Sequence, residues 1–114
     1  MTPDEAKLII RMRQINGKKW KEIMEHFPQK KIIGLIQWNH THWTERHVNP
    51  PRLSRPWSKA ELENLQSLKD QQGLGWPEIR AAFPGRSHPE IEFQLLRLCA
   101  EAGEDQVGSS GPSE

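Results

Sequence analysis

The stretch that decides the fold is RPWSKAELENLQSLKDQQGLGWPEIRAAFPGRS, residues 55–87. Ser58 and Glu61 match the pattern of a helix capping box, in which the hydroxyl accepts a backbone N–H and the glutamate reaches back to the cap. Apolar residues follow at helical spacing: Leu62, Leu65 and Leu68. Gly73 stands where a helix end favours a left-handed residue. The stretch therefore begins with a predicted helix, at about 59–71.

Two more helices are predicted downstream. The helix at about 76–83 carries large apolar residues at spacings of three and four: Trp76, Ile79 and Phe83. Pro84 stops it. A further capping pattern, Ser87 to Glu90, opens a helix at about 88–100, whose buried stripe is Ile91, Leu95 and Leu98.

The same pattern occurs 56 residues earlier, without a gap. The identical pairs include Glu5/Glu61, Gly17/Gly73, Trp20/Trp76, Glu22/Glu78, Ile23/Ile79, Phe27/Phe83 and Pro28/Pro84. This copy predicts helices at about 4–15, 19–27 and 31–44, and the register of the last is unclear. Two copies of a period above ~50 indicate two domains rather than a solenoid, which needs about three units.

The predicted fold class is all-α, as two tandem three-helix bundles at 1–47 and 57–100. A proline-rich, basic linker at 48–56 joins them. Residues 101–114 have the composition of a disordered acidic tail. The predicted structural core is Trp20, Ile23, Phe27, Trp57, Trp76, Ile79, Phe83 and Ile91.

Composition excludes several classes of protein. No apolar run reaches the ~18 residues of a membrane span, so no membrane association is expected. Cys99 is the single cysteine, and we expect a small apolar helix residue there rather than a reactive thiol. His40 and His42 would point about 200° apart on a helix, so we expect no metal site. Motifs for catalysis or phosphate binding are missing, which predicts no enzyme, cofactor or small-molecule substrate.

The second copy resembles a Myb/SANT repeat. The residues that carry the resemblance are Trp57, Trp76, Ile79, Phe83, Gly85, Arg86 and Ser87. The first copy is a degraded version, with Met1 in place of Trp57 and Gln-Lys-Lys at 29–31 in place of Gly-Arg-Ser. The resemblance implies a helix-turn-helix variant, a nuclear location, and a third helix that enters the DNA major groove in DNA-binding members.

The first copy is the candidate DNA-binding unit. The family's base-reading positions fall on Ile33, Ile36, Gln37 and His40, of which Gln37 could pair with adenine. Phosphates could be neutralised by Lys18, Lys19, Lys21, Lys30, Lys31, Arg52 and Arg55. The alternative is that these side chains form an ordinary solvated face.

The second copy departs from that pattern. Its corresponding positions are Pro89, Glu92, Phe93 and Leu96, and Glu92 would be repelled by phosphate. Phe93 and Leu96 lie off the buried stripe. They either complete a wide core or form, with Glu92, an exposed patch for a protein partner.

Charge also separates the halves. Residues 1–47 carry nine Lys/Arg against five Asp/Glu, whereas residues 100–114 carry four acids and no base. Our leading hypothesis is a nuclear, chromatin-associated protein that binds double-stranded DNA through the first copy and linker. A chromatin or nuclear protein would bind the second copy. The alternative is an adaptor subunit whose two copies bind proteins and no DNA.

Overall fold

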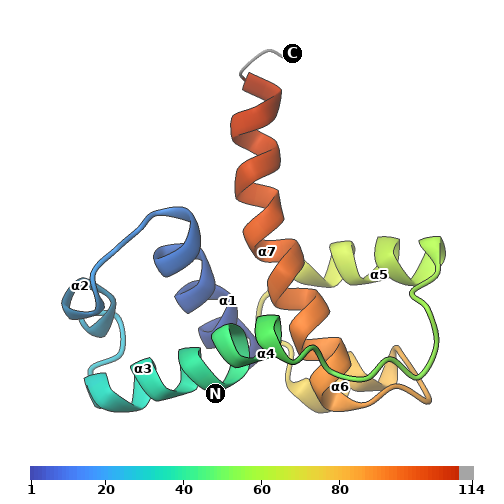
Figure 1. Ribbon diagram of the computed structural model, residues 1–114, viewed down its shortest axis with the longest axis horizontal. Coiled ribbons are helices and arrows are strands. Elements are labelled where there is room, and N and C mark those ends of the chain that lie inside the picture. The colour runs from blue at the N-terminus through green and yellow to red at the C-terminus, as the bar shows by residue number, and fades with distance from the viewer. Residues whose placement is uncertain (111–114) are drawn as a thin grey trace.

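The computed structural model describes the backbone of residues 1–110 and the side chains of residues 1–101 (Figure 1). It confirms the all-α class, and no described helix is long and apolar enough to cross a membrane. The elements are α1 (Pro3–Ile10), η1 (Arg11–Ile15), α2 (Trp20–Met24), α3 (Ile32–Asn39), η2 (His40–Thr44), α4 (Glu45–Val48), α5 (Lys59–Lys69), α6 (Trp76–Ala81) and α7 (His88–Ser110). The segments η1 and η2 are π-helical turns.

The helix starts and turns form as their sequence signals predict. The Glu5 backbone N–H donates to Thr2 Oγ1 (3.1 Å), and the Thr2 N–H donates to Glu5 Oε1 (2.9 Å). Ser58 and Glu61 form the same pair at the start of α5. Gly17 and Gly73 have φ angles of 63° and 82°, a left-handed conformation that glycine adopts without steric cost.

The elements build an N-terminal unit from α1 to α4 and a C-terminal unit from α5 to α7. The buried cores of both units use positions that the 56-residue offset pairs: Ile9/Leu65, Ile23/Ile79, Phe27/Phe83 and Leu35/Ile91. Trp20, Trp57 and Trp76, predicted as core residues, pack against the two cores but are only partly buried at their edges. The Trp76 indole N–H donates to the Met1 carbonyl (2.8 Å), whereas the Trp57 N–H is buried and finds no acceptor among the described residues.

Both third helices are longer than expected. The chain stays helical after α3, through η2 and then α4, which ends at Val48. Val48, where the linker was predicted to begin, is therefore the last residue of α4. The helix α7 runs to Ser110, through most of the segment expected to be disordered. Glu101, Ala102 and Glu104 favour helix, and α7 needs no new nucleus to continue. The rest of the expected tail, residues 111–114, lies outside the described part of the chain.

A third apolar cluster joins the two units. Ala6 and Ile10, one turn apart on α1, are fully buried against Leu96 and Cys99 of α7. The α1 residues that fill the N-terminal core, such as Ile9, lie on a different face of the helix. The helix α1 thus buries two faces, and α7 is shared between its own core and the contact with the other unit.

A buried lysine completes this contact. Lys7 has a relative exposure of 1%, and its ammonium donates to two carbonyls, that of Lys69 at the last residue of α5 (3.2 Å) and that of Gln71 just beyond it (2.7 Å). A cation is favourable at a helix C-terminus, where carbonyls lack partners. Asp4 lies 3.5 Å from Lys7 and accepts the Gly73 N–H (2.8 Å). The two units therefore dock in a defined orientation.

We predict that Lys7→Met destabilises the protein by about 1–3 kcal/mol, because the alkyl stem stays packed while buried carbonyls lose their donor. Urea unfolding followed by circular dichroism measures the change. Lys31→Met, at an exposed site, is the matched control and should stay within about 0.5 kcal/mol of the parent. Equal stability of the two variants would contradict the capping role.

Candidate nucleic-acid interface

The outward face of α3 and η2 carries the four predicted base-reading residues. Leu35 is fully buried in the core and fixes the rotation of the helix. Ile33 and Ile36 then point outward, with exposed fractions of 56% and 37%, and Gln37 and His40 are exposed too. Their spacing of three, four and seven residues places them on one side of the helix. The structure thus brings these positions together on one solvent-facing surface.

The corresponding face of α7 is buried. Pro89 is exposed, but Glu92, Phe93 and Leu96 have exposed fractions of 2%, 8% and 0%. The prediction that they form an exposed protein-binding patch is therefore wrong. Their contacts come from the N-terminal unit, since Leu96 packs on α1 and the Phe93 ring lies 6.2 Å from that of Trp43.

The negative charge of Glu92 is paired with basic side chains inside this contact. Its carboxylate accepts from His42 Nδ1 at 2.8 Å and from the Arg46 guanidinium, and His88 Nε2 lies 3.7 Å away. His42 and Arg46 belong to η2 and α4, so the extension beyond α3 supplies the partners of a buried acid. Sequence reasoning missed this group, because pairing across the two units is not visible in the spacing along the chain.

The predicted phosphate-binding lysines are mostly free of acidic partners. Lys18, Lys19 and Lys21 are exposed around the start of α2, and Lys31 is exposed at the start of α3. Within residues 1–101 these four form no ion pair. Lys30 is half-buried and lies 3.9 Å from Glu5. The N-terminal unit therefore presents unneutralised ammonium groups at the starts of two adjacent helices.

His40 and the linker arginines differ in their surroundings. His40 Nε2 lies 3.5 Å from Glu45 Oε2, although both side chains are exposed. Arg52 is exposed. Arg55 donates to Glu61 (2.8 Å) and to the carbonyl of Pro84 (3.3 Å), so it is held by the C-terminal unit.

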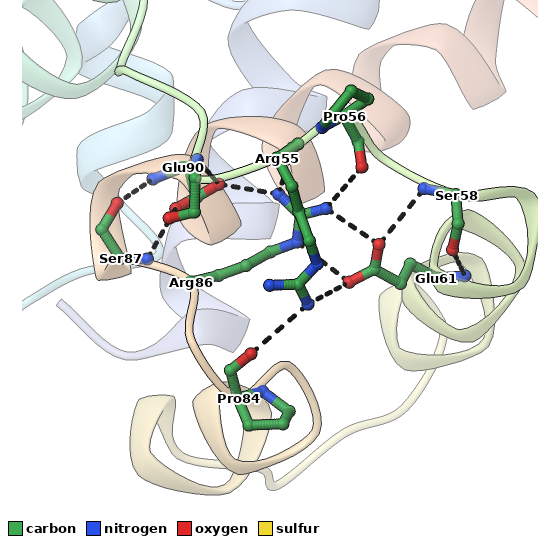
Figure 2. Close-up of polar contacts among 9 residues, drawn as sticks. Arg55, Pro56, Ser58, Glu61, Pro84, Arg86, Ser87 and Glu90 are labelled. Atoms are coloured by element: carbon green, nitrogen blue, oxygen red, sulfur yellow. Dashed lines mark hydrogen bonds and ion pairs between the residues drawn. The ribbon is translucent and has the colours of Figure 1, made fainter.

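Arg55 belongs to a polar network centred on Arg86 (Figure 2). The Arg86 side chain is fully buried and donates to Glu61 (2.8 and 2.9 Å), to Glu90 (2.7 Å) and to the backbone carbonyls of Arg55 and Pro56 (both 2.8 Å). Its guanidinium also lies 3.8 Å from the centre of the Trp57 ring. The family motif pointed to Arg86, but not to its role as the residue that fastens the linker to the C-terminal unit.

The network shifts the acidity of its two carboxyl groups. The hydrogen bond from Arg86 holds the pKa of Glu61 well below its ordinary value. Burial raises the pKa of Glu90, but hydrogen bonds from Ser54, Ser87 and Arg86 outweigh it and bring the pKa to about 2, from 4.5. Carboxylates with depressed pKa stabilise the fold above their unfolded-state pKa, and this contribution is lost as pH falls through the folded-state value.

The groups exposed on this surface are suited to binding a partner. In the part of the chain with described side chains, no three His, Cys, Asp or Glu residues gather in a way that could hold a metal ion. The exposed helix face and its lysines offer hydrogen-bonding, apolar and cationic groups to a partner. The class defined by the fold is an all-helical protein of helix-turn-helix type.

Comparison with known proteins points to Myb proteins. The chain is 29% identical over 87 residues to "Transcription factor MYB3R-1" of Arabidopsis thaliana, and 29% identical over 76 residues to "Transcription factor MYB3R-4" of the same plant. These alignments cover 75% and 66% of this chain, but 11% and 7% of the relatives. "Myb-related protein A" of Gallus gallus is 28% identical over 99% of this chain and 15% of its own length.

The chain thus spans only a small part of the curated relatives that it matches. Neither a family model nor a solved structure matches it. The similarities support a Myb-like domain in this chain.

The Arg86 network should give the protein a marked acid sensitivity. Because the pKa of Glu90 falls from 4.5 to about 2 on folding, the melting temperature should drop as pH is lowered through this window. Glu90→Gln should melt lower at pH 7 and show a shallower fall below pH 4.5. Glu63→Gln, at an exposed site on α5, is the control and should keep the parent's pH profile. An unchanged acid slope in Glu90→Gln would contradict the assignment.

Proposed function

We propose that this chain is a nuclear, chromatin-associated protein with two Myb/SANT-type units, and that its N-terminal unit binds double-stranded DNA. One observation carries the proposal: of the two third helices, α3 exposes its outward face and α7 buries the equivalent face. The Myb transcription factors similar to the chain support DNA as the partner. No catalysis is part of this function.

Phosphate contacts provide most of the affinity in this proposal. Lys18, Lys19, Lys21 and Lys31 are exposed without acidic partners, and Lys30 needs only to leave a long contact with Glu5. Cations of this kind displace counterions from the duplex. Arg52 adds a further cation from the linker, whereas the Arg55 guanidinium is already bound to Glu61 and Pro84.

Base contacts contribute less. On the exposed face of α3, Gln37 can pair with the N6 and N7 atoms of adenine, and His40 can donate to a base or a phosphate. Ile33 and Ile36 can contact only apolar groups such as the thymine methyl. Sequence preference is therefore modest.

The C-terminal unit acts as a support in this proposal. Its third helix holds the N-terminal unit through Phe93, Leu96 and Cys99, and the α7 face equivalent to the exposed α3 face is buried in this contact. Fixing the orientation of α3 on a larger rigid body reduces the ordering cost of binding.

The salt dependence of duplex binding tests this function. If about four phosphates are neutralised, log affinity should fall with log salt with a slope near −3.6, from ~0.9 per phosphate. Lys30→Glu with Lys31→Glu should weaken binding to all duplexes alike and flatten the slope, whereas Gln37→Ala should change the preference among sequences. Fluorescence anisotropy at several salt concentrations measures both effects.

Arg97→Glu is the matched control, since this exposed arginine lies on α7 near Glu101 and is not among the proposed DNA contacts. It should leave the slope unchanged. No binding of the intact chain to any duplex at low salt would exclude the proposal.

The exposed isoleucines favour a second candidate, a protein adaptor. Ile32, Ile33 and Ile36 are 42%, 56% and 37% exposed on neighbouring turns of α3, which is unusual for a surface that only meets phosphate. An adaptor would lose its partner on Ile33→Asp and would show no salt-dependent duplex binding.

A further inference from the structure

The contact between the two units joins a different surface from each. The N-terminal unit contributes a face of α1 together with Trp38 and residues of η2 and α4, and the C-terminal unit contributes the outward face of α7. Such a contact is heterologous, because neither side presents the surface that the other presents. Since the two units correspond at an offset of 56 residues, each also has a counterpart of the surface used by the other.

The counterpart of the N-terminal surface is an open groove on the C-terminal unit. It lies between α5 and α7 and has a volume of about 700 Å³. Its lining includes Leu62, Glu63, Gln66, Ser67, Gln94 and Leu98. These positions stand 56 residues after Ala6, Lys7, Ile10, Arg11, Trp38 and His42, which all contact the C-terminal unit. The position that receives a helix in the first unit is thus unfilled in the second.

The counterpart of the α7 surface is the exposed face of α3. Ile33, Ile36, Gln37 and His40 stand 56 residues before Pro89, Glu92, Phe93 and Leu96. Seven large hydrophobic residues are exposed in the described part of the chain, and three of them, Ile32, Ile33 and Ile36, stand 56 residues before α7 positions. A fourth, Ile15, stands 56 residues before Gln71, whose carbonyl accepts from Lys7 in the internal contact. An apolar surface of this kind is typical of a protein contact.

We propose that the α3 face of one copy of this chain docks into the α5–α7 groove of a second copy, so that the protein associates head to tail. The internal contact between the units is the template for this interface. The proposal does not depend on DNA binding, but DNA and a second copy would compete for α3.

The residues that would meet between two copies match each other in polarity, as the residues of the internal contact do. In the internal contact, Glu92 of α7 pairs with His42 at 2.8 Å. The positions that would replace this pair between copies are Ile36 and Leu98, which are both apolar. A buried polar pair would thus be replaced by an apolar pair, and neither version leaves a group unmatched.

Charge is complementary as well. Lys7, which meets carbonyls at Lys69 and Gln71, is replaced in the groove by Glu63. The segment that Glu63 would face on the second copy contains Arg13 and lies beside Lys18. Glu63 thus stands in place of Lys7 at a position where the segment it would face is basic. The basic N-terminal half of one copy would meet the acidic C-terminal half of the other.

Sedimentation velocity over a range of concentrations tests the proposal. The weight-average sedimentation coefficient of the parent chain should rise with concentration as copies associate. Ile33→Asp, on the α3 face, and Leu62→Asp, in the groove, should each stay monomeric. A 1:1 mixture of these two variants should form a dimer and nothing larger, because each supplies the surface that the other lacks. Val48→Asp, at a site that is 74% exposed on α4, is the control and should associate like the parent.

A charge reversal covers the case in which Leu62→Asp fails to fold. Glu63→Lys, at an exposed groove position, should weaken self-association several-fold without changing the circular dichroism spectrum. A parent chain that stays monomeric at all concentrations would overturn the proposal, as would variants that associate like the parent or a mixture that does not dimerise. Leu62→Asp should keep duplex binding, so a failure of self-association is separable from a failure of DNA binding.

Discussion

The packing of α7 against α1 is the contact on which the rest of the structure depends. Leu96 and Cys99 are removed from water by Ala6 and Ile10, and Lys7 fixes the geometry by capping the chain past α5. Among the described side chains, the core cluster of each unit has five buried hydrophobic residues. Small cores supply little net stability, so the shared interface supports both units.

This packing also makes the two units functionally unequal. The third helix of a unit can present its outward side either to a ligand or to the other unit. The outward side of α7 packs against the other unit. The Arg86 network supports this arrangement, because its contacts with Glu61, Glu90 and the linker backbone hold the linker on the C-terminal unit. Among the surfaces that remain free are the α3 face with its lysines and the groove between α5 and α7, and both proposals follow from these two.

Much of the fold could be predicted from the sequence because its signals are local. Capping boxes, glycines at turns and apolar spacing depend on residues a few positions apart, so α5, α6 and the core position Ile79 could be located. The burial of Phe93 and Leu96 could not be predicted, because their partners lie some 50 or more residues away in the other unit. The α3 face was predicted from the base-reading positions of the family, because the apolar spacing left the register of that helix unclear. The hydrogen bond from Arg55 to Glu61 was not predicted, because it arises from the path of the linker.

Thiol modification of Cys99 tests the central claim, that the α7 face is docked on the N-terminal unit. This single cysteine is 1% exposed between the units, and burial raises the pKa of its thiol. The rate of reaction with an aromatic disulfide reagent should therefore equal the rate of unfolding in the native protein. Ala6→Glu, which places a charge in the contact, should react rapidly while circular dichroism remains helical. Rapid reaction of Cys99 in the parent protein under native conditions, with the helical signal intact, would contradict the docked arrangement.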